Sequence, residues 1–217
     1  MNLKINNLDR FKNNYRIQSA RAQWWDYGWN GAYFITICIR EKERYFGEIV
    51  GGEMVLSDIG KIAQKYWNEI PNYFSFVTLD SFVIMPNHMH GILIIDKSDQ
   101  IANSGKMGNI YHCRDAINRV STELQSTTKP KLATKSESKT IGGISGSKNP
   151  MLHDNIPRII RWYKGRCTFE IRKMKSPFAW QPRYHDHIIR NNAEFQRISD
   201  YIKTNPENWE KDKFYCH

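Results

Sequence analysis

The run Phe82-Val83-Ile84-Met85-Pro86-Asn87-His88-Met89-His90-Gly91-Ile92-Leu93-Ile94-Ile95 decides the fold of this chain. The β-branched and aromatic residues on both sides of Pro86-Asn87 predict two strands, and Pro-Asn is typical of a turn. Side chains alternate along a strand, so we expect His88 and His90 on one face and Met89 in the core.

Upstream of this run, residues 32–39 are β-branched and aromatic and predict a buried strand. Gly51-Gly52 predicts the turn of a short hairpin. Ser57 is a candidate cap of a helix that Pro71 would end. The apolar residues of that helix follow the spacing of one helical face: Ile59, Ile62, Ala63, Tyr66, Trp67 and Ile70. A strand is expected at 76–85.

Downstream, residues 97–154 are rich in Ser, Thr, Lys and Gly and predict an inserted loop with a short helix near 115–125. Asn155 is the expected cap of the next helix, with Pro157 at the first helical position. A loop is expected at 175–190, followed by a last helix from about Asn192. The first thirty residues, polar and aromatic, predict an arm packed on the core.

The expected fold is therefore α+β in a single domain of 217 residues, with an antiparallel sheet and its helices on one face. One face of the sheet would then stay open for a ligand. Hydrophobic residues make up 40% of the chain, enough for a sizeable core. The sequence has no apolar run of about 18 residues, so it predicts no membrane-spanning helix.

Composition also bears on location and partners. The four cysteines are scattered, form no metal-binding or disulfide pattern, and fit a reducing cytoplasm, and the N-terminus lacks the apolar core of a secretory signal. We expect a cytoplasmic protein with no membrane partner. The net charge of +10 favours an anionic partner, of which nucleic acid is the commonest.

Two clusters carry residues for chemistry. Imidazoles on one face of a strand, such as His88 and His90, can converge on a divalent metal, although an isolated pair is more often simply exposed. Tyr201 and Asn205 are four residues apart and share a helix face, so a phenol oxygen could attack phosphorus while the Asn205 amide completes a metal site. A half-buried tyrosine and a helix-ending Asn before Pro206 are the alternative.

A third group of residues offers contacts to nucleic acid. Cationic side chains can bind phosphates, and aromatic rings can stack on unpaired bases. A packed polar corner under the last helix is the competing interpretation for the segment 180–190. The candidates are Arg158, Arg161, Lys164, Trp180, Arg183, Tyr184 and Arg190.

Taken together, these segments resemble the IS200-like single-tyrosine HUH transposases, and especially the REP-associated tyrosine transposases. The resemblance covers about residues 20–96 and 155–209. It rests on a combination of segments spread along the chain: Tyr27, residues 30–38, residues 82–91, Trp180-Gln181, Tyr184, Asp186-His187, Arg190, Tyr201-Ile202 and Asn205-Pro206.

The resemblance implies a ferredoxin-like, RRM-like fold with an HUH nuclease core. It implies that His88 and His90 bind a divalent metal (Mg²⁺ or Mn²⁺), that Asn205 is the third ligand, and that Tyr201 is the nucleophile. The implied reaction cuts and rejoins single-stranded hairpin DNA through a 5′-phosphotyrosine link, without ATP. Relatives differ in whether the tyrosine serves its own subunit or the partner in a homodimer, and both arrangements stay open.

Two other functions fit parts of this pattern. A non-catalytic protein that binds single-stranded nucleic acid could use the same basic sheet, but it would not need His88, His90, Tyr201 and Asn205 together. A hydrolytic metalloenzyme would need more carboxylate or histidine ligands than the sequence places near these residues.

Overall fold

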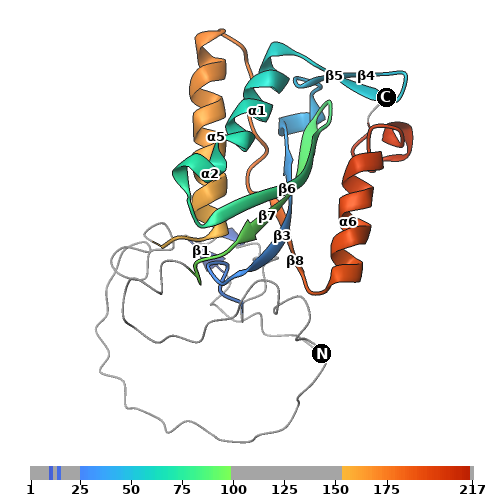
Figure 1. The fold of residues 1–217 in the computed structure, drawn as a ribbon. Helices are drawn as coiled ribbons and strands as arrows, with labels where there is room; N and C mark the ends of the chain where they lie inside the picture. The colour runs from blue at the N-terminus through green and yellow to red at the C-terminus, as the bar shows by residue number, and fades with distance from the viewer. Residues whose placement is uncertain (1–9, 12–13, 16–24, 99–152, 216–217) are drawn as a thin grey trace, which may run out of the picture.

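A computed structural model describes residues 10–11, 14–15, 25–98 and 153–215 of the chain. Its centre is an antiparallel sheet with the strand order β6-β7-β3-β8 (Figure 1). Of the expected arm at 1–30 and the expected insertion at 97–154, most residues lie outside the described part, and so does the short helix expected near 115–125.

The strands of this sheet are β3 (Gly31–Cys38), β6 (Val77–Ile84), β7 (His88–Ile95) and β8 (His185–Ile189). β3 lies inside the sheet and pairs antiparallel with both β7 and β8. The antiparallel sheet is thus confirmed, and so are the strands predicted at 76–85 and after Asn87. The expected loop at 175–190 is wrong in part, because it contains β8.

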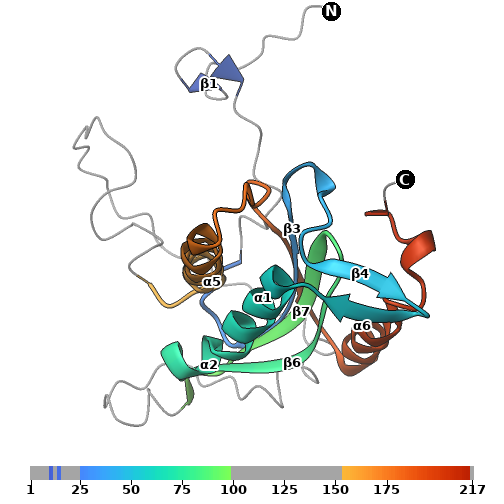
Figure 2. The same cartoon turned by 90° about the horizontal axis from the view of Figure 1, so that it is seen from above.

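Helices cover both faces of the sheet (Figures 1 and 2). On one face, α1 (Asp58–Asn68) and α5 (Ile156–Lys173) pack in the main core with Ile35 and Leu93. On the other face, α6 (Asn192–Thr204) packs in a smaller core. That core consists of Ala32, Ile92, Ile189, Ile198 and Ile202.

The expectation that all helices lie on one face is therefore wrong for α6. The reason is that β3 and β7 are apolar on both faces: Tyr33 and Leu93 are buried on one, and Ala32 and Ile92 on the other. A sheet that is apolar on both sides needs a cover on each side. The open face that we expected for a ligand is largely taken by α6.

Side-chain caps begin the three long helices. Ser57 Oγ accepts a hydrogen bond from the Gly60 amide at 3.0 Å, and Asn155 Oδ1 accepts one from the Arg158 amide at 3.0 Å. Both caps were expected from the sequence, and Asn191 caps α6 in the same way. Pro71 does not end α1, which stops at Asn68, but lies in the first turn of the short α2 (Ile70–Tyr73).

The remaining elements are short. The hairpin of β4 (Gly47–Val50) and β5 (Glu53–Leu56) turns at Gly51 and Gly52, as the sequence predicts. Both glycines have positive φ. β1 (Arg10–Phe11) pairs with β2 (Asn14–Tyr15). Two 3-10 turns complete the described elements: η2 (Arg40–Lys42) and η4 (Trp209–Lys211). Among the described helices, none combines the length and apolarity needed to cross a membrane.

Candidate active site

His88 and His90 lie at the start of β7 on the face of the sheet that α6 covers. Both side chains are buried, and their Nε2 atoms are 3.1 Å apart. Strand alternation therefore turns the two imidazoles toward one point, as the sequence predicts. Met89, between them, is fully buried in the main core on the opposite face.

The other ring nitrogen of each histidine is held by a neighbouring side chain. His88 Nδ1 lies 2.8 Å from Asn87 Oδ1, and His90 Nδ1 lies 2.8 Å from Thr36 Oγ1. Thr36 is directly opposite His90 in the pairing of β3 with β7. An Nδ1–H that donates to such an oxygen leaves the Nε2 lone pair free, which is the tautomer that a metal ligand needs.

Burial keeps both imidazoles neutral. It lowers the pKa of His88 to about 3, and the positive charges of Lys213 and Lys42 add to this effect. The pKa of His90 is also far below its ordinary value, first through burial and then through His88. Neutral imidazole is the form that coordinates metals, so no proton has to leave at neutral pH.

Tyr201 projects from α6 toward the same point. Its hydroxyl oxygen lies 3.3 Å from His90 Nε2, and it donates a hydrogen bond to Asp212 Oδ2 at 3.3 Å. The side chain is 41% exposed, so a ligand can reach it from solvent. Partial burial and the negative charge of Asp212 raise the pKa of Tyr201 to about 12.

Asp212 was missed by the sequence analysis. It lies just after η4, and its carboxylate and the ring nitrogens of His88 and His90 fall within 4.8 Å of one another. Its Oδ1 accepts a hydrogen bond from the Phe214 amide at 2.7 Å, which fixes the carboxylate. No spacing in the sequence links Asp212 to the histidines, because only the turn after α6 brings them together.

Asn205, at the end of α6, completes the cluster. Its Nδ2 donates to Asp212 Oδ2 at 3.1 Å, while its buried Oδ1 has no hydrogen-bond partner among the described residues. A buried amide oxygen without a partner is costly unless a ligand satisfies it. Two imidazole nitrogens and the Asp212 carboxylate form a donor set that fits a divalent cation. Asn205, expected from the sequence as a third ligand, is hydrogen-bonded to that carboxylate.

The segment after η4 also covers part of the site. The Phe214 ring lies 4.4 Å from the His88 ring, measured between centroids. Asn87 Nδ2 donates a hydrogen bond to the Phe214 carbonyl oxygen at 2.8 Å. Asn87 therefore holds both His88 and the chain that packs over it, which explains why this turn residue is fully buried.

The seven residues expected to bind DNA lie on α5 and in the segment 180–190. Arg158 and Arg161 lie on α5, on the opposite side of the sheet from Tyr201 (Figure 2). Lys164 Nζ donates to the carbonyl oxygens of Gln181 at 2.8 Å and Arg183 at 2.7 Å. Partial burial lowers the pKa of Lys164 to about 8.

The other expected contacts come from the segment before and after β8. Trp180 is half-buried against Phe46 and Phe178, and its Nε1 donates to the Lys164 carbonyl oxygen. Tyr184 is half-buried beside the main core. Arg183 and Arg190 are exposed, and Arg190 lies just beyond the end of β8.

Comparison with known proteins gives one close relative. No protein family model matches the chain. An uncharacterized protein of Haemophilus influenzae is 35% identical over 199 residues, which is 91% of this chain and 92% of that protein. The two proteins belong to one family. The match spans nearly the full length of both chains.

A solved structure shares the fold. A REP-associated tyrosine transposase bound to a REP hairpin superposes with a TM-score of 0.50 and 16% sequence identity, covering 90% of this chain and 77% of that one. At this identity the likeness concerns the arrangement of helices and strands. It is consistent with the mixed α/β architecture and the antiparallel sheet described above.

Proposed function

We propose that this protein is a metal-dependent, single-tyrosine HUH nuclease that cuts and rejoins single-stranded DNA, with Tyr201 as the nucleophile. The observation that carries the proposal is the position of the Tyr201 hydroxyl, 3.3 Å from His90 Nε2 and 3.3 Å from Asp212 Oδ2. The fold likeness to a tyrosine transposase supports a role in DNA processing.

The topology supports the same assignment. In chain order, β3, α1 and β6 are followed by β7, α5 and β8, and the strands lie in the order β6-β7-β3-β8. We interpret this order, with α1 and α5 on one face, as a ferredoxin-like arrangement to which α6 is added. His88 and His90 then lie on a central strand, and α6 brings Tyr201 over them.

The proposed reaction is a transfer of phosphorus between two oxygens. The Tyr201 oxygen forms a bond to the phosphorus of a phosphodiester, and the bond from phosphorus to the 3′ oxygen breaks. The 3′ oxygen takes up a proton, and the DNA stays linked to the tyrosine through its 5′ phosphate. Rejoining is the reverse transfer, so it needs no ATP.

The phenol proton has a nearby acceptor. With a pKa of about 12, Tyr201 is neutral at pH 7 and must lose its proton as it attacks. Asp212 Oδ2, which already accepts the hydrogen bond from this hydroxyl, is placed to receive it. The metal ligands would be His88, His90, Asp212 and Asn205. A bound Mg²⁺ or Mn²⁺ would supply charge neutralisation at the scissile phosphate.

The test is denaturing electrophoresis after incubation with labelled single-stranded hairpin DNA and Mn²⁺. We expect a covalent adduct with the parent protein and none with Tyr201→Phe, whose DNA affinity should be unchanged. Replacing both His88 and His90 by Ala should also remove the adduct. DNA binding by the parent protein without any adduct would favour the non-catalytic binding protein instead, and an undiminished adduct in Tyr201→Phe would move the nucleophile elsewhere.

A further inference from the structure

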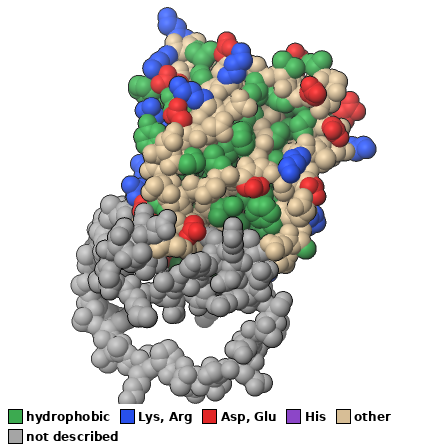
Figure 3. All heavy atoms as spheres, in the orientation of Figure 1, with side chains coloured by type: hydrophobic (Ala, Val, Ile, Leu, Met, Phe, Trp, Pro, Cys, Tyr) green, Lys and Arg blue, Asp and Glu red, His purple; other side chains and the backbone are tan. Residues whose placement is uncertain are grey.

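A pocket outside the candidate active site lies on α5, in the layer of helices on the opposite side of the sheet from α6. An open pocket of about 390 Å³ is lined by Arg158, Arg161, Trp162, Gly165 and Arg166. These positions share the side of α5 opposite to its buried residues, such as Ile160 and Tyr163. In the space-filling view, Lys and Arg side chains gather along the edge that α5 forms (Figure 3).

One of the three arginines is in an ion pair, and the other two make none with a described residue. Arg158 pairs with Asp154 at the start of α5. The Arg166 guanidinium lies 5.2 Å from the centroid of the Tyr66 ring, and its buried Nε has no hydrogen-bond partner among the described residues. Arg161 is exposed and makes no ion pair with another described residue. The pocket therefore presents positive charge with free donors, which suits an anion.

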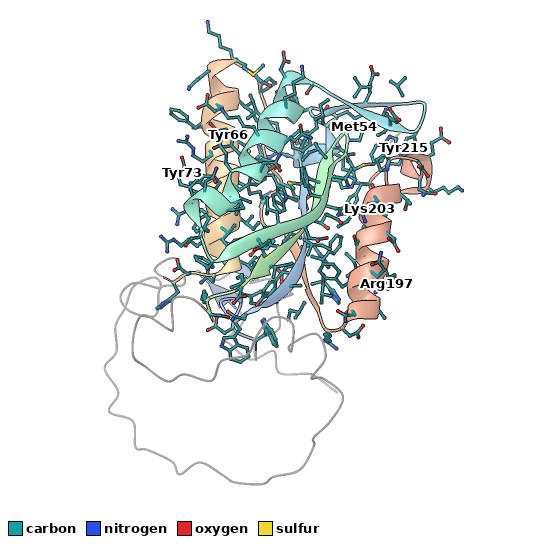
Figure 4. All side chains as sticks on the ribbon, viewed as in Figure 1. Met54, Tyr66, Tyr73, Arg197, Lys203 and Tyr215 are labelled. Carbon is teal, nitrogen blue, oxygen red and sulfur yellow. The ribbon has the colours of Figure 1, made fainter. Side chains whose placement is uncertain are left out.

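One wall of the pocket is aromatic. The Trp162 ring lies 4.4 Å from the Tyr73 ring and 6.4 Å from the Tyr66 ring, measured between centroids. Tyr66 and Tyr73 lie beside α5 (Figure 4), and Tyr73 is 56% exposed. Arginines next to accessible rings can bind a phosphate and stack against its sugar or base.

Gly165 is one of the residues that line the pocket. Glycine is the least favourable residue after proline in a helix interior, and Gly165 lies in the middle of α5. A Cβ added there would meet no described atom within 4 Å. Packing between described residues therefore gives no reason for this glycine. Gly165 leaves the helix surface without a side chain between Arg161 and Arg166, which also line the pocket.

We infer that this pocket binds the phosphate backbone of the DNA substrate at a point remote from the phosphate that is cut. The inference rests on the proposed function. Arg158 and Arg166 are eight residues apart, a rise of about 12 Å along the helix. This spacing of the arginines is longer than one small anion and suits successive phosphates of a DNA strand.

The location of the pocket separates the proposed DNA contact on α5 from the phosphate that Tyr201 attacks. The sheet lies between α5 and α6, so DNA held on α5 cannot be the segment that Tyr201 attacks (Figure 2). A substrate in both places must pass around an edge of the sheet. The contact on α5 then fixes which phosphate of the strand reaches Tyr201, and short oligonucleotides that cover only the cleavage point would lose this anchor.

Substitutions at Gly165 test the pocket without removing a contact from the fold. Gly165→Glu adds a negative charge to the pocket, and Gly165→Gln adds a side chain of the same size without charge. The affinity for a labelled hairpin with a single-stranded flank is measured by fluorescence anisotropy in EDTA. We expect Gly165→Glu to weaken binding about tenfold and Gly165→Gln by less than about threefold. Arg161→Ala should lower the salt slope by about one.

Arg172→Ala is the matched control, because Arg172 is an exposed arginine on α5 that does not line the pocket. Its affinity should equal that of the parent protein. Parental affinity in Gly165→Glu would overturn the inference, and so would an equal loss in Arg172→Ala and Arg161→Ala. The assay needs no cleavage, so absence of a covalent adduct would refute the proposed function while the affinities still decide the pocket.

Discussion

The hydroxyl oxygen of Tyr201 lies 3.3 Å from Nε2 of His90, although 111 positions in the sequence separate the two residues. Tyr201 is on α6 and His90 on β7, and the two elements meet through the small core that contains Ile92 and Ile202. The packing of one helix on one face of the sheet therefore sets the distance between the proposed nucleophile and the imidazoles.

Thr36→Val should weaken metal binding without changing the fold. The substitution keeps the shape of the side chain but removes the Oγ1 that holds His90 Nδ1 at 2.8 Å. Loss of such a partner typically lowers metal affinity by about 10–100-fold. Titration calorimetry with Mn²⁺ measures the change. Thr168→Val is the control, because Thr168 Oγ1 donates its hydrogen bond within α5, to the Lys164 carbonyl oxygen. Equal Mn²⁺ affinity in the two variants would contradict the role of Thr36.

Much of this site could be predicted from the sequence. Alternation along 88–95 places His88 and His90 on one face, and this needs only the period of a strand. The helix that carries Tyr201 follows from its apolar spacing. Which face of the sheet this helix covers does not follow, because a continuous apolar run hides whether one side or both sides of a strand are buried.

The parts that were missed depend on tertiary contacts. β8 has only five residues, and His185, Asp186 and His187 give it a polar appearance typical of a loop. Asp212 reaches the histidines only because η4 reverses the chain after α6. A sequence pattern relates residues that are close along the chain. It therefore does not identify Asp212, which reaches the histidines only through the tertiary fold.

Gly91→Ala should destabilise the protein. A Cβ at Gly91 would lie 2.4 Å from a ring carbon of Trp67, which is fully buried. Overpacking of this kind costs about 1–3 kcal/mol. Chemical denaturation measures the free energy of unfolding. Gly165→Ala is the opposite control: its Cβ meets nothing, and the helix should gain about 1 kcal/mol.

A second substitution checks the cause. If the clash with Trp67 is responsible, Trp67→Phe should relieve it, and the double variant should lose less stability than the sum of the single variants. Additive losses would show that Gly91→Ala acts through the strand backbone rather than through the ring.

Acid should destabilise the metal-free protein through His88. Its pKa is about 3 in the folded protein, below the ordinary value of about 6.5 for the unfolded chain. As pH falls below about 6.5, the unfolded state binds the proton first, so stability is complete above this pH and is lost toward pH 3. The slope from one such group approaches about 1.4 kcal/mol per pH unit.

The comparison is between the parent protein and His88→Gln, unfolded with denaturant at pH 7.5, 6.5, 5.5 and 4.5, which are about one unit apart. Carboxylates titrate in both proteins, so the difference between the two curves isolates the imidazole. We expect the stability of His88→Gln to fall less steeply below pH 6.5. If the stabilities of the two proteins fall equally with pH, protonation of His88 does not contribute to the loss of stability in acid.

Asp212→Asn should weaken metal binding and also lower the pKa of Tyr201. The substitution keeps the size of the side chain and its polar atoms, but it removes the negative charge beside His88 and His90. Affinity for a divalent cation depends on the number of charged ligands, so we expect the Mn²⁺ affinity to fall on the order of tenfold. The same charge raises the pKa of Tyr201, and without it the phenol should ionise more easily.

Asp200→Asn separates these local effects from a general change in charge. Asp200 precedes Tyr201 on α6, is exposed, and bonds Gln196 rather than the histidines. Both variants change the net charge by the same amount, so a long-range effect would lower the Mn²⁺ affinity equally in the two. An unchanged Mn²⁺ affinity in Asp212→Asn would show that the carboxylate is not a metal ligand. The proposed ligands would then be His88, His90 and Asn205. If Asp212 accepts the phenol proton, Asp212→Asn must also slow adduct formation at saturating Mn²⁺, where weaker metal binding no longer limits the rate.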